Sequence, residues 1–424
     1  MCLLYLFVAN FFSMKIKLYW QVLIAMVLGI TFALIFKEQA LIAKPLGTIF
    51  MRLLKMIIVP LIIFSITSGV INLGKNIGRV GAKTFGYYLF TSLIAIVIGL
   101  TLANLIKPGV GIDLGSVATE FDPALLSTPS SPFDIIIRMI PLNPLAAAVE
   151  GDILGIIFWC IVFGSVIPQL PKKHRLVLNQ FFNAGFEAMM ILTKAVIIFL
   201  PIGVFGLIST AVATTGFELF KGVAMYMVTI TIGLTLHAFV ILPVIFFLFT
   251  RINPIKHYRA IAPAMAAAFS TSSSGATLPV TMDCVETNAG VSNKISSFVL
   301  PLGATINMDG TALYECAGVL FIAQALGFDL SFTQQLIIVI TAFLASVGAA
   351  AIPSAGLVMI FIVLDAVGLG NHPGAALIVG TMLAVDRPLD MYRTVVNITS
   401  DSIGAVIVAK SEGEKDLYDF KKQT

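Results

Sequence analysis

The sequence predicts an all-α polytopic membrane protein. Of its 424 residues, 58% are hydrophobic and only 11% are charged, whereas a soluble domain has about 25% charged residues. The long apolar runs favour membrane-spanning helices, because a helix satisfies its own backbone hydrogen bonds in lipid. The formal net charge of +4 is small and indicates no nucleic-acid partner.

The cysteines and histidines form no metal-binding pattern. The four cysteines are scattered without a Cys-x-x-Cys pair, so we expect unpaired thiols packed in apolar surroundings. The four histidines form no His-x-x-x-His pair. Residues 1–13 are apolar but lack the basic start and the cleavage site of a signal peptide, and Met14 is the expected start of the protein.

Six apolar segments in residues 14–250 are long enough to cross a bilayer. They lie at 18–36, 46–71, 83–106, 133–169, 188–213 and 222–250. Lys and Arg are concentrated in alternate connections, which predicts a cytoplasmic N-terminus and an external loop at 107–132. Pro141, Pro144 and the Glu150-Gly-Asp152 sequence interrupt the fourth segment, so several short helices are expected there.

The C-terminal part, residues 256–411, has a pattern that occurs twice. Two small-residue segments, Ser270–Pro279 and Ala345–Gly356, are flanked by apolar stretches of about 10–14 residues, which suit re-entrant hairpins better than spans. We expect two hairpins, each followed by a polar-bearing span, and a cytoplasmic tail: 256–290 and 293–323, 332–368 and 373–411, then 412–424. Such a repeat is typical of transporters built from inverted repeats.

Five polar residues near the C-terminus predict a binding site inside the membrane. Asp386, Asp390, Arg393, Asn397 and Asp401 are spaced 4, 3, 4 and 4 residues apart. They therefore share one face of a helix with about 3.6 residues per turn. Each unpaired charge at bilayer depth costs about 2.5–3.5 kcal/mol or more. We interpret this stripe as one wall of a site for charged solutes.

The sequence Asn307-Met-Asp309-Gly310-Thr311 predicts a cation site in the span 293–323. Gly303 and Gly310 weaken the helix, and carbonyl groups freed by unwinding are suitable ligands for Na⁺. The alternative is a polar kink whose groups are satisfied by neighbouring helices. The predicted site contains four aspartates, Asp309, Asp386, Asp390 and Asp401. Together with Arg393 they give a net charge of −3 if Arg387 faces elsewhere. Bound cations or protons are therefore expected to neutralise the site.

Arg393 and Asp390 lie one turn apart and predict recognition of a zwitterion. The planar guanidinium of Arg393 matches a carboxylate bidentately, and Asp390 can hold an ammonium group. The alternative is an Arg393–Asp390 pair that only neutralises itself. The serine-rich tip around Ser272 and Ser274 offers hydroxyl and N–H groups for a second carboxylate.

The remaining polar residues in the apolar segments can either bind a ligand or serve only in packing. Arg387 is expected to snorkel or to pair between helices rather than to bind a ligand. Glu315 is either a proton carrier or a packed polar group. On their own, Tyr88, Thr91 and Ser92 are expected to be packing hydroxyls.

These motifs resemble the dicarboxylate/amino acid:cation symporter family, which includes glutamate and aspartate transporters. The resemblance covers nearly the whole chain from about residue 16, and its matches are 271–279, Leu300–Thr311, 345–356 and Asp390–Asn397. The string Asn307–Thr311 between the two tips is highly specific. It implies eight transmembrane helices and two re-entrant hairpins. It also implies a homotrimer in the lipid membrane, in which each transport domain moves like an elevator along a trimerisation scaffold.

The resemblance implies roles for individual residues. Arg393 is implied to bind the side-chain carboxylate of the substrate and Asp390 its amino group. The remaining implied substrate contacts are Ser272, Ser274, Thr311, Ile352, Gly356, Thr394 and Asn397. Three implied Na⁺ sites contain Gly303, Asn307, Asn397 and Asp401; Thr305, Ser346, Val347 and Ala349; and Tyr88, Thr91, Ser92, Asn307 and Asp309. No organic cofactor is implied.

Some residues depart from the family pattern. Ser400, Tyr392 and Ala351 stand where other members have Gly, and Ala351 is expected to stiffen the second tip. Glu315 matches the eukaryotic excitatory transporters, in which this position is linked to proton coupling. Co-transport of a proton beside Na⁺ is therefore a hypothesis for this chain.

The favoured function is a secondary-active symporter of L-glutamate and L-aspartate in the inner cell membrane, with both termini cytoplasmic. Neutral amino acids and C4-dicarboxylates are alternatives, but the first would leave Arg393 unpaired and the second Asp390. An ion channel is a different class, which two occluding hairpins fit poorly. An enzyme is not expected, because no His or Lys base lies near Ser272–Ser274.

Overall fold

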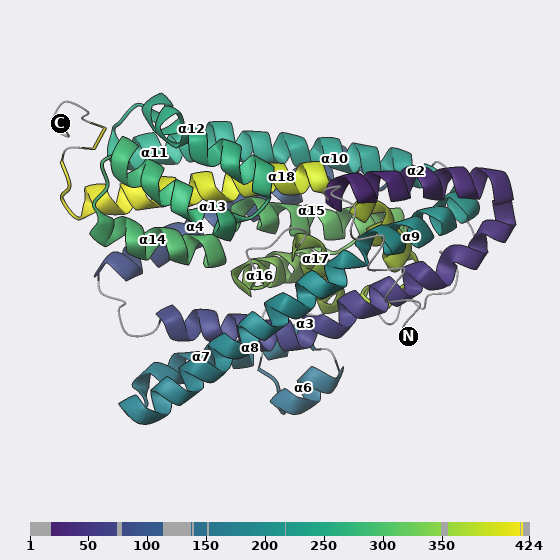
Figure 1. Ribbon diagram of the computed structural model, residues 1–424, viewed down its shortest axis with the longest axis horizontal. Coiled ribbons are helices and arrows are strands. Elements are labelled where there is room, and N and C mark those ends of the chain that lie inside the picture. Colours follow the sequence, from purple (N-terminus) through teal and green to yellow (C-terminus); the bar gives the residue numbers. More distant parts are fainter. Residues whose placement is uncertain are drawn as a thin grey trace.

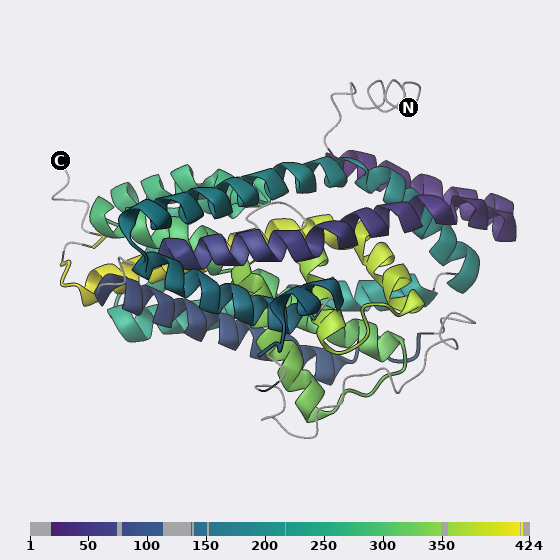
Figure 2. The ribbon, with the colours of Figure 1, turned by 90° about the horizontal axis from the view of Figure 1, so that it is seen from below.

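The computed structural model describes residues 18–73, 79–112, 137, 140–150, 152–216, 218–348, 355–415 and 417–418. In these ranges the regular secondary structure is helical, without a strand. Most of the long helices run lengthwise through the molecule (Figure 1), as the view from below also shows (Figure 2). The expected start at Met14 and most of the expected loop at 107–132 lie outside the described residues.

Four helical stretches in the described ranges are long and apolar enough to cross a membrane. They are Trp20–Ile71, Arg79–Ile106, Lys172–Ile198 and Leu219–Thr250. Large apolar side chains on them face outward: Leu28 is 55% exposed and Phe249 61% exposed. In a membrane such side chains contact lipid, so this surface agrees with the predicted class of protein.

One group of helices is built around α3 (Lys44–Leu73). The helix α2 (Leu18–Phe36) leads into it through the 3₁₀ helix η1 (Lys37–Ala43) and packs on α9 (Leu200–Thr215). The helix α3 also packs on α7 (Ile153–Val166), α8 (Lys172–Ile198) and α9. Glycine permits the close crossing at α9, since a Cβ at Gly206 would lie 2.6 Å from the backbone nitrogen of Gly47.

The fourth and fifth predicted segments fold differently from each other. The fourth contains two short helices, α6 (Pro144–Glu150) and α7, as predicted; Asp152 caps α7 by accepting a hydrogen bond from the Gly155 nitrogen at 3.3 Å. The prediction of the fifth as one segment over 188–213 is wrong, because the chain divides there between α9, which begins at Leu200, and α8, which begins at Lys172. Its first turns carry Lys172, Lys173 and Arg175, so an apolar pattern does not mark them.

The second group surrounds α18 (Pro373–Ser411). It contains α4 (Arg79–Ile106), α10 (Glu218–Leu236), the π-helical turn η5 (His237–Ile241), α11 (Leu242–Thr250), α14 (Asn293–Ile306) and α15 (Asp309–Ala325). Two helix pairs complete it: α12 (Pro254–Thr271) with α13 (Ser274–Asp283), and α16 (Phe332–Gly348) with α17 (Ala355–Ala366). The π-helical turn η6 (Cys284–Asn288) follows α13. α18 packs on α4, α10, α12, α14 and α15.

The chain reverses between α12 and α13 through its serines. α12 ends at Ser272, whose φ of 52° is left-handed, and the side chain of Ser273 caps α13 by accepting a hydrogen bond from the Ala276 nitrogen at 3.2 Å. At the other end of α12, His257 lies 3.0 Å from Ser402 Oγ and 2.6 Å from Tyr418 Oη. Tyr418, expected in a tail, is therefore buried against the core.

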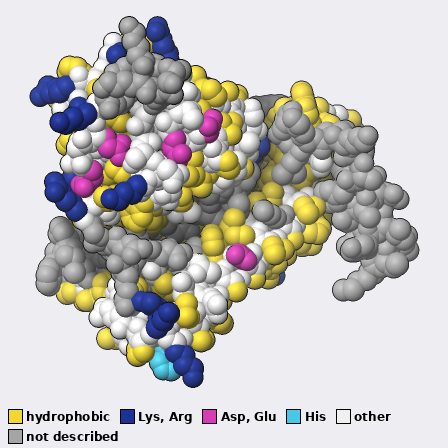
Figure 3. Space-filling model, turned by 60° about the vertical axis from the view of Figure 1, so that its left-hand side comes forward, with side chains coloured by type: hydrophobic (Ala, Val, Ile, Leu, Met, Phe, Trp, Pro, Cys, Tyr) yellow, Lys and Arg dark blue, Asp and Glu magenta, His cyan; other side chains and the backbone are white. Residues whose placement is uncertain are grey.

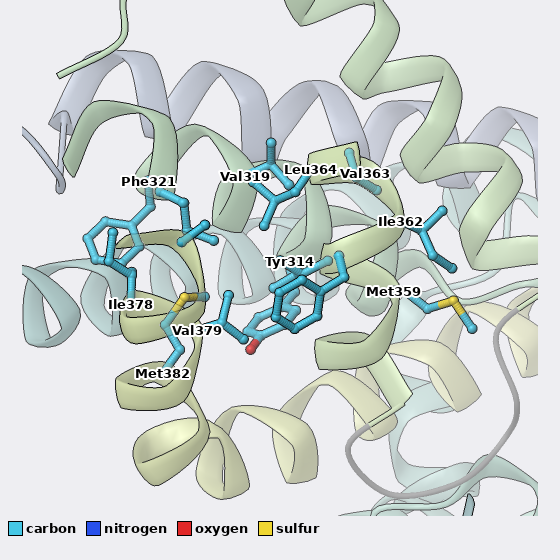
Figure 4. Packing of buried hydrophobic residues seen from close by; sticks show 14 of the residues in the cluster. Tyr314, Val319, Phe321, Met359, Ile362, Val363, Leu364, Ile378, Val379 and Met382 are labelled. Carbon is cyan, nitrogen blue, oxygen red and sulfur yellow. The ribbon is translucent and has the colours of Figure 1, made fainter. Parts of the chain in front are cut away.

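The apolar centre of the second group holds α15 between α17 and α18. Figure 4 shows Tyr314 and Phe321 of α15 among Met359 of α17 and Met382 of α18. Every labelled side chain there is almost wholly buried. The two groups of helices meet where α18 packs on α9 and where α16 and α17 pack on α3. There Lys55 Nζ of α3 donates a hydrogen bond to the Gly370 carbonyl at 2.6 Å.

We expect Gly99→Ala to destabilise the protein, because α4 and α15 pack closely at this glycine. The added Cβ would lie 2.6 Å from the carbonyl oxygen of Leu313, so the two helices must separate. Overpacking of this kind costs about 1–3 kcal/mol. The matched control is Gly86→Ala on the same helix, where a Cβ meets nothing within 4 Å. Thermal unfolding in detergent measures both; equal melting temperatures would contradict the close packing.

Candidate functional site

The polar stripe of α18 is buried along its whole length. Asp386, Asp390, Arg393, Asn397 and Asp401 are between 1% and 6% exposed. The helix is continuous through all five, as their spacing predicts. Because buried charges require partners, the neighbours of these five side chains define the candidate site.

Arg393 is the charged centre of one half of the site. Its Nη2 lies 2.8 Å from Asp390 Oδ1 and 3.2 Å from Asp386 Oδ1, and its guanidinium carbon lies 3.7 Å from the centre of the Tyr314 ring. Arg387 Nη1 lies 3.4 Å from Asp390 Oδ2, so Arg387 pairs within its own helix. The self-neutralising Asp390–Arg393 pair is thus present.

The pairing leaves part of the Arg393 guanidinium available. Within the described residues, its Nη1 and Nε are buried and have no hydrogen-bond partner. A Cβ at Gly356 would lie 3.0 Å from Nη1 and 3.4 Å from Thr311 Cγ2. Three helices, α15, α17 and α18, therefore converge on this edge of Arg393, and the small residue at 356 gives access to it.

The chain unwinds between α14 and α15 and exposes backbone polar groups. The break lies at Asn307 and Met308, between the two predicted weak points at Gly303 and Gly310. Asn397 contacts the first turn of α15 beside the break: its Oδ1 accepts a hydrogen bond from the Gly310 nitrogen at 2.8 Å, and its Nδ2 donates to Thr311 Oγ1 at 3.3 Å. The predicted unwinding is confirmed.

Asp401 and Asn307 form the first of two carboxylate clusters at the break. Asn307 Nδ2 donates to Asp401 Oδ1 at 2.9 Å and to Ser400 Oγ at 3.0 Å. A Cβ at Gly303 would collide with Asp401 Oδ1 and lie 2.5 Å from Tyr88 Oη, so only glycine fits there. The structure therefore brings Gly303, Asn307 and Asp401 of one predicted Na⁺ site together.

Asp309 is the centre of the second cluster. Ser92 Oγ donates to its Oδ1 at 2.7 Å and Thr91 Oγ1 lies 3.3 Å from the same oxygen. Both hydroxyls also lie 3.4 Å from Asn307 Oδ1. The hydroxyl of Tyr88 instead donates to the Val299 carbonyl at 2.8 Å. Thr91 and Ser92 are therefore more than packing hydroxyls.

His237 is a site residue that the sequence did not reveal. Its Nε2 lies 3.0 Å from Asp309 Oδ2, and both side chains are fully buried. When Asp309 is ionised its carboxylate can only accept hydrogen bonds, and Nε2 of His237 is then the donor. A single histidine within the apolar run 222–250 is the signal that was available. It lies in the π-helical turn η5, and the hydroxyl of Tyr258 donates to the nearby Ala238 carbonyl.

The other predicted site residues make fewer contacts with Asp309, Asp401 and Arg393. Ser272 and Ser274 are buried at the tip between α12 and α13, both of which pack on α18. Thr394 donates to the Asp390 carbonyl at 2.9 Å. Thr305 is exposed and Ser346 buried, on helices α14 and α16 that pack together; the Val347 side chain, Ala349 and Ile352 lie outside the described residues.

The charges of the site fall into two unequal halves. Asp386 and Asp390 are balanced by Arg387 and Arg393, so that half is neutral. Counted as ionised, Asp309 and Asp401 contribute −2 together, and no Lys or Arg among the described residues pairs with either. The expected −3 depended on Arg387 facing elsewhere, and its contact with Asp390 changes the total to −2.

Glu315 lies in the same buried core as Arg393, and its carboxyl group has no hydrogen-bond partner among the described residues. It is fully buried on α15, one turn after Thr311. A protonated carboxyl is much less costly to bury than an ionised one. This surrounding favours the interpretation of Glu315 as a proton-binding group over that of a packed polar group.

Comparisons with known proteins identify the family of this chain. The profile of the Sodium:dicarboxylate symporter family matches residues 18–411. The excitatory amino acid transporter 3 of Homo sapiens is 37% identical over 459 positions, covering 94% of this chain and 86% of its own. The proton/sodium-glutamate symport protein of Geobacillus stearothermophilus is 34% identical, covering 94% and 96%. The proton/glutamate-aspartate symporter of Escherichia coli (strain K12) is also 34% identical, covering 95% of each.

We expect Ser92→Ala to weaken cation binding, because it removes the 2.7 Å hydrogen bond that orients Asp309 Oδ1. The Na⁺ concentration that gives half of the Na⁺-dependent rise in melting temperature should increase about tenfold. Thr101→Val is the control, since its exposed hydroxyl on the same helix only donates to the Val97 carbonyl. An unchanged Na⁺ dependence in Ser92→Ala would exclude this cluster as a Na⁺ site.

Proposed function

The chain belongs to the sodium:dicarboxylate symporter family, and we propose that it is a secondary-active symporter that takes up L-glutamate and L-aspartate together with Na⁺ and H⁺. The observation that supports this most directly is the partly unpaired Arg393 in a neutral, buried cluster. A buried guanidinium with unused donors matches a carboxylate that arrives with the substrate.

The proposed substrate position follows from these contacts. The side-chain carboxylate of the amino acid binds the Nη1 edge of Arg393 beside Gly356, and its ammonium group binds Asp390. Ser272, Ser274 and Thr311 hold the main-chain carboxylate, and Thr394, Asn397 and Ile352 complete the pocket. A neutral amino acid would leave the Arg393 edge empty, and a C4-dicarboxylate would bring no cation for Asp390.

Cation coupling follows from the charge balance. Asp309 and Asp401 contribute −2, and an acidic amino acid contributes a further −1 to a buried site. Three monovalent cations neutralise this total, in line with the three Na⁺ sites that the family resemblance implies. In the proposal these sites are Gly303, Asn307, Asn397 and Asp401; Thr305, Ser346, Val347 and Ala349; and Tyr88, Thr91, Ser92, Asn307 and Asp309.

The wider organisation is proposed from the two groups of helices. We propose that the group around α3 is a trimerisation scaffold and that the group around α18 is the transport domain, which moves along it as an elevator. The helix pairs α12–α13 and α16–α17 act as re-entrant hairpins, giving eight transmembrane helices in all. The protein is a homotrimer of the inner cell membrane, with both termini in the cytoplasm, and carries no catalytic reaction.

We expect Arg393→Ala to reduce Na⁺-driven uptake of labelled L-aspartate and L-glutamate into proteoliposomes by at least about 100-fold, since a buried carboxylate would lose its charged partner. The matched control is Arg387→Ala, a partly exposed neighbour, for which a loss below about fivefold is expected. Equal losses in the two variants would contradict the assignment of Arg393.

The wild-type protein provides the other decisive outcomes of this assay. Uptake driven by a proton gradient without Na⁺ would contradict the Na⁺ sites. A linear, non-saturating current would favour an ion channel. Absence of uptake for both amino acids would leave family membership intact and redirect the substrate search to succinate, serine and cystine.

We expect Glu315→Gln to remove the dependence of uptake on external pH while Na⁺-driven uptake remains. The amide is close in shape to the carboxyl group but cannot carry the proton across. Uptake is measured at several external pH values with a fixed Na⁺ gradient. Glu38→Gln, an exposed carboxylate in η1, is the control and should behave as the wild type. A pH dependence that survives in Glu315→Gln would refute proton transport by this residue.

A further inference from the structure

A cavity lies away from the transport site, at the end of the core where α4 begins and α18 ends. Its volume is about 330 Å³. Gly86 and Phe90 of α4, Phe249 of α11 and Ile407 of α18 form its apolar walls, and Lys83 and Ser411 lie at one end. We call it the α4–α18 cavity. None of these side chains belongs to the substrate or Na⁺ sites proposed above.

Two aromatic side chains that line the cavity are exposed at the surface of the protein. Phe90 is 46% exposed and Phe249 61% exposed. Phe90 lies seven residues after Lys83, which is about 10 Å along a helix. The cavity thus has a basic end and an apolar depth, both open from the lipid-facing side of α4 and α11.

Gly86 is the residue that keeps the cavity open. A Cβ built there meets no atom within 4 Å. A side chain at this position would therefore enter the cavity without displacing the helices around it. The cavity is open because residue 86 has no side chain. A single substitution at Gly86 can therefore fill it.

The basic end carries an excess of positive charge. Lys83 Nζ lies 2.5 Å from Glu412 Oε1 and 2.9 Å from Ser411 Oγ, and Arg79 Nε lies 3.3 Å from the same Glu412 oxygen. Lys294 also acts on Glu412, and the hydrogen bond from Lys83 is the main cause of its lowered pKa. Lys83 and Arg79 thus contact one carboxylate, and Lys294 acts on it more weakly. Lys and Arg side chains lie around this end of the molecule, with Asp and Glu side chains between them (Figure 3).

We propose that the α4–α18 cavity binds an anionic glycerophospholipid, with an acyl chain along Gly86 and Phe90 and the phosphate on Lys83 and Arg79. An apolar cavity that opens toward the bilayer suits an acyl chain, and the surplus of cations selects an anionic headgroup. Glu412 competes with that headgroup for Lys83. The bound lipid joins α4, α11 and α18, so it steadies the end of the core.

The test measures lipid selectivity directly and does not require transport. The chain has only two tryptophans, so Phe90→Trp in a Trp20→Phe, Trp159→Phe background reports on the cavity alone. Quenching of this tryptophan by brominated phosphatidylglycerol and by brominated phosphatidylcholine is compared in mixed vesicles. We expect phosphatidylglycerol to bind about fivefold more strongly. A tryptophan at Val97, on the same helix and 51% exposed, should show no preference.

Three variants separate the headgroup from the acyl chain. Lys83→Gln should lower the affinity ratio of phosphatidylglycerol to phosphatidylcholine towards one. Glu412→Gln should raise this ratio, because the competing carboxylate is removed. Gly86→Leu should abolish the preference by filling the cavity. Gly69→Leu on α3 is its matched control, since a Cβ there also meets nothing within 4 Å. The melting temperature of each variant shows whether it is folded.

Several outcomes would overturn the proposal. Equal quenching by both lipids in the parent protein would exclude a selective site. If the preference for phosphatidylglycerol survives in Gly86→Leu, the lipid binds only to the surface cations and its acyl chain does not occupy the cavity. Weak quenching that becomes strong on removal of residues 419–424 would identify the C-terminal segment of the chain itself as the occupant.

Discussion

The burial of charged groups on α18 is the constraint on which the rest of the core depends. Each of its four charged residues in the stripe is at most 6% exposed, so each needs partners inside an apolar bundle. Two partners come from α18 itself, because Arg387 and Arg393 lie one turn from Asp390. The partner of Asp401 comes from the break between α14 and α15. The packing of α4, α10, α14 and α15 around α18 is therefore also a set of polar contacts.

Irregular backbone occurs where these contacts are made. The unwound residues Asn307 and Met308 turn the Gly310 nitrogen towards Asn397, and the π-helical turn η5 begins at His237, which reaches Asp309. A regular helix would have used those backbone groups internally, and such departures at membrane depth are tolerated only inside protein. The same segments that weaken the helices thus supply the groups that a cation or an amino acid can contact.

The sequence was sufficient for the features that one helix carries alone. The spacing of Asp386 to Asp401 predicted their shared face, the two glycines predicted the break near 307, and the first helix was expected at its observed bounds. Features that depend on another helix were missed. His237 lies 72 residues before its partner Asp309, on a different helix. The start of α8 was missed because its first turns carry Lys172, Lys173 and Arg175, and its end was missed because the apolar pattern continues through Phe199 into α9.

The arrangement of charge along α18 bears on how two ligands can depend on each other. The neutral cluster at Arg393 and the negative clusters at Asp309 and Asp401 are separate, but Asn397 lies between them and contacts both Gly310 and Thr311. A cation that fixes the break at Asn307 also fixes the orientation of Asn397 and Thr311, beside the edge of Arg393. Any such coupling is reciprocal, because a ligand at Arg393 must favour the cation-bound arrangement by the same free energy. Short polar contacts across one helix break can therefore link the two halves without a large change in the surrounding core.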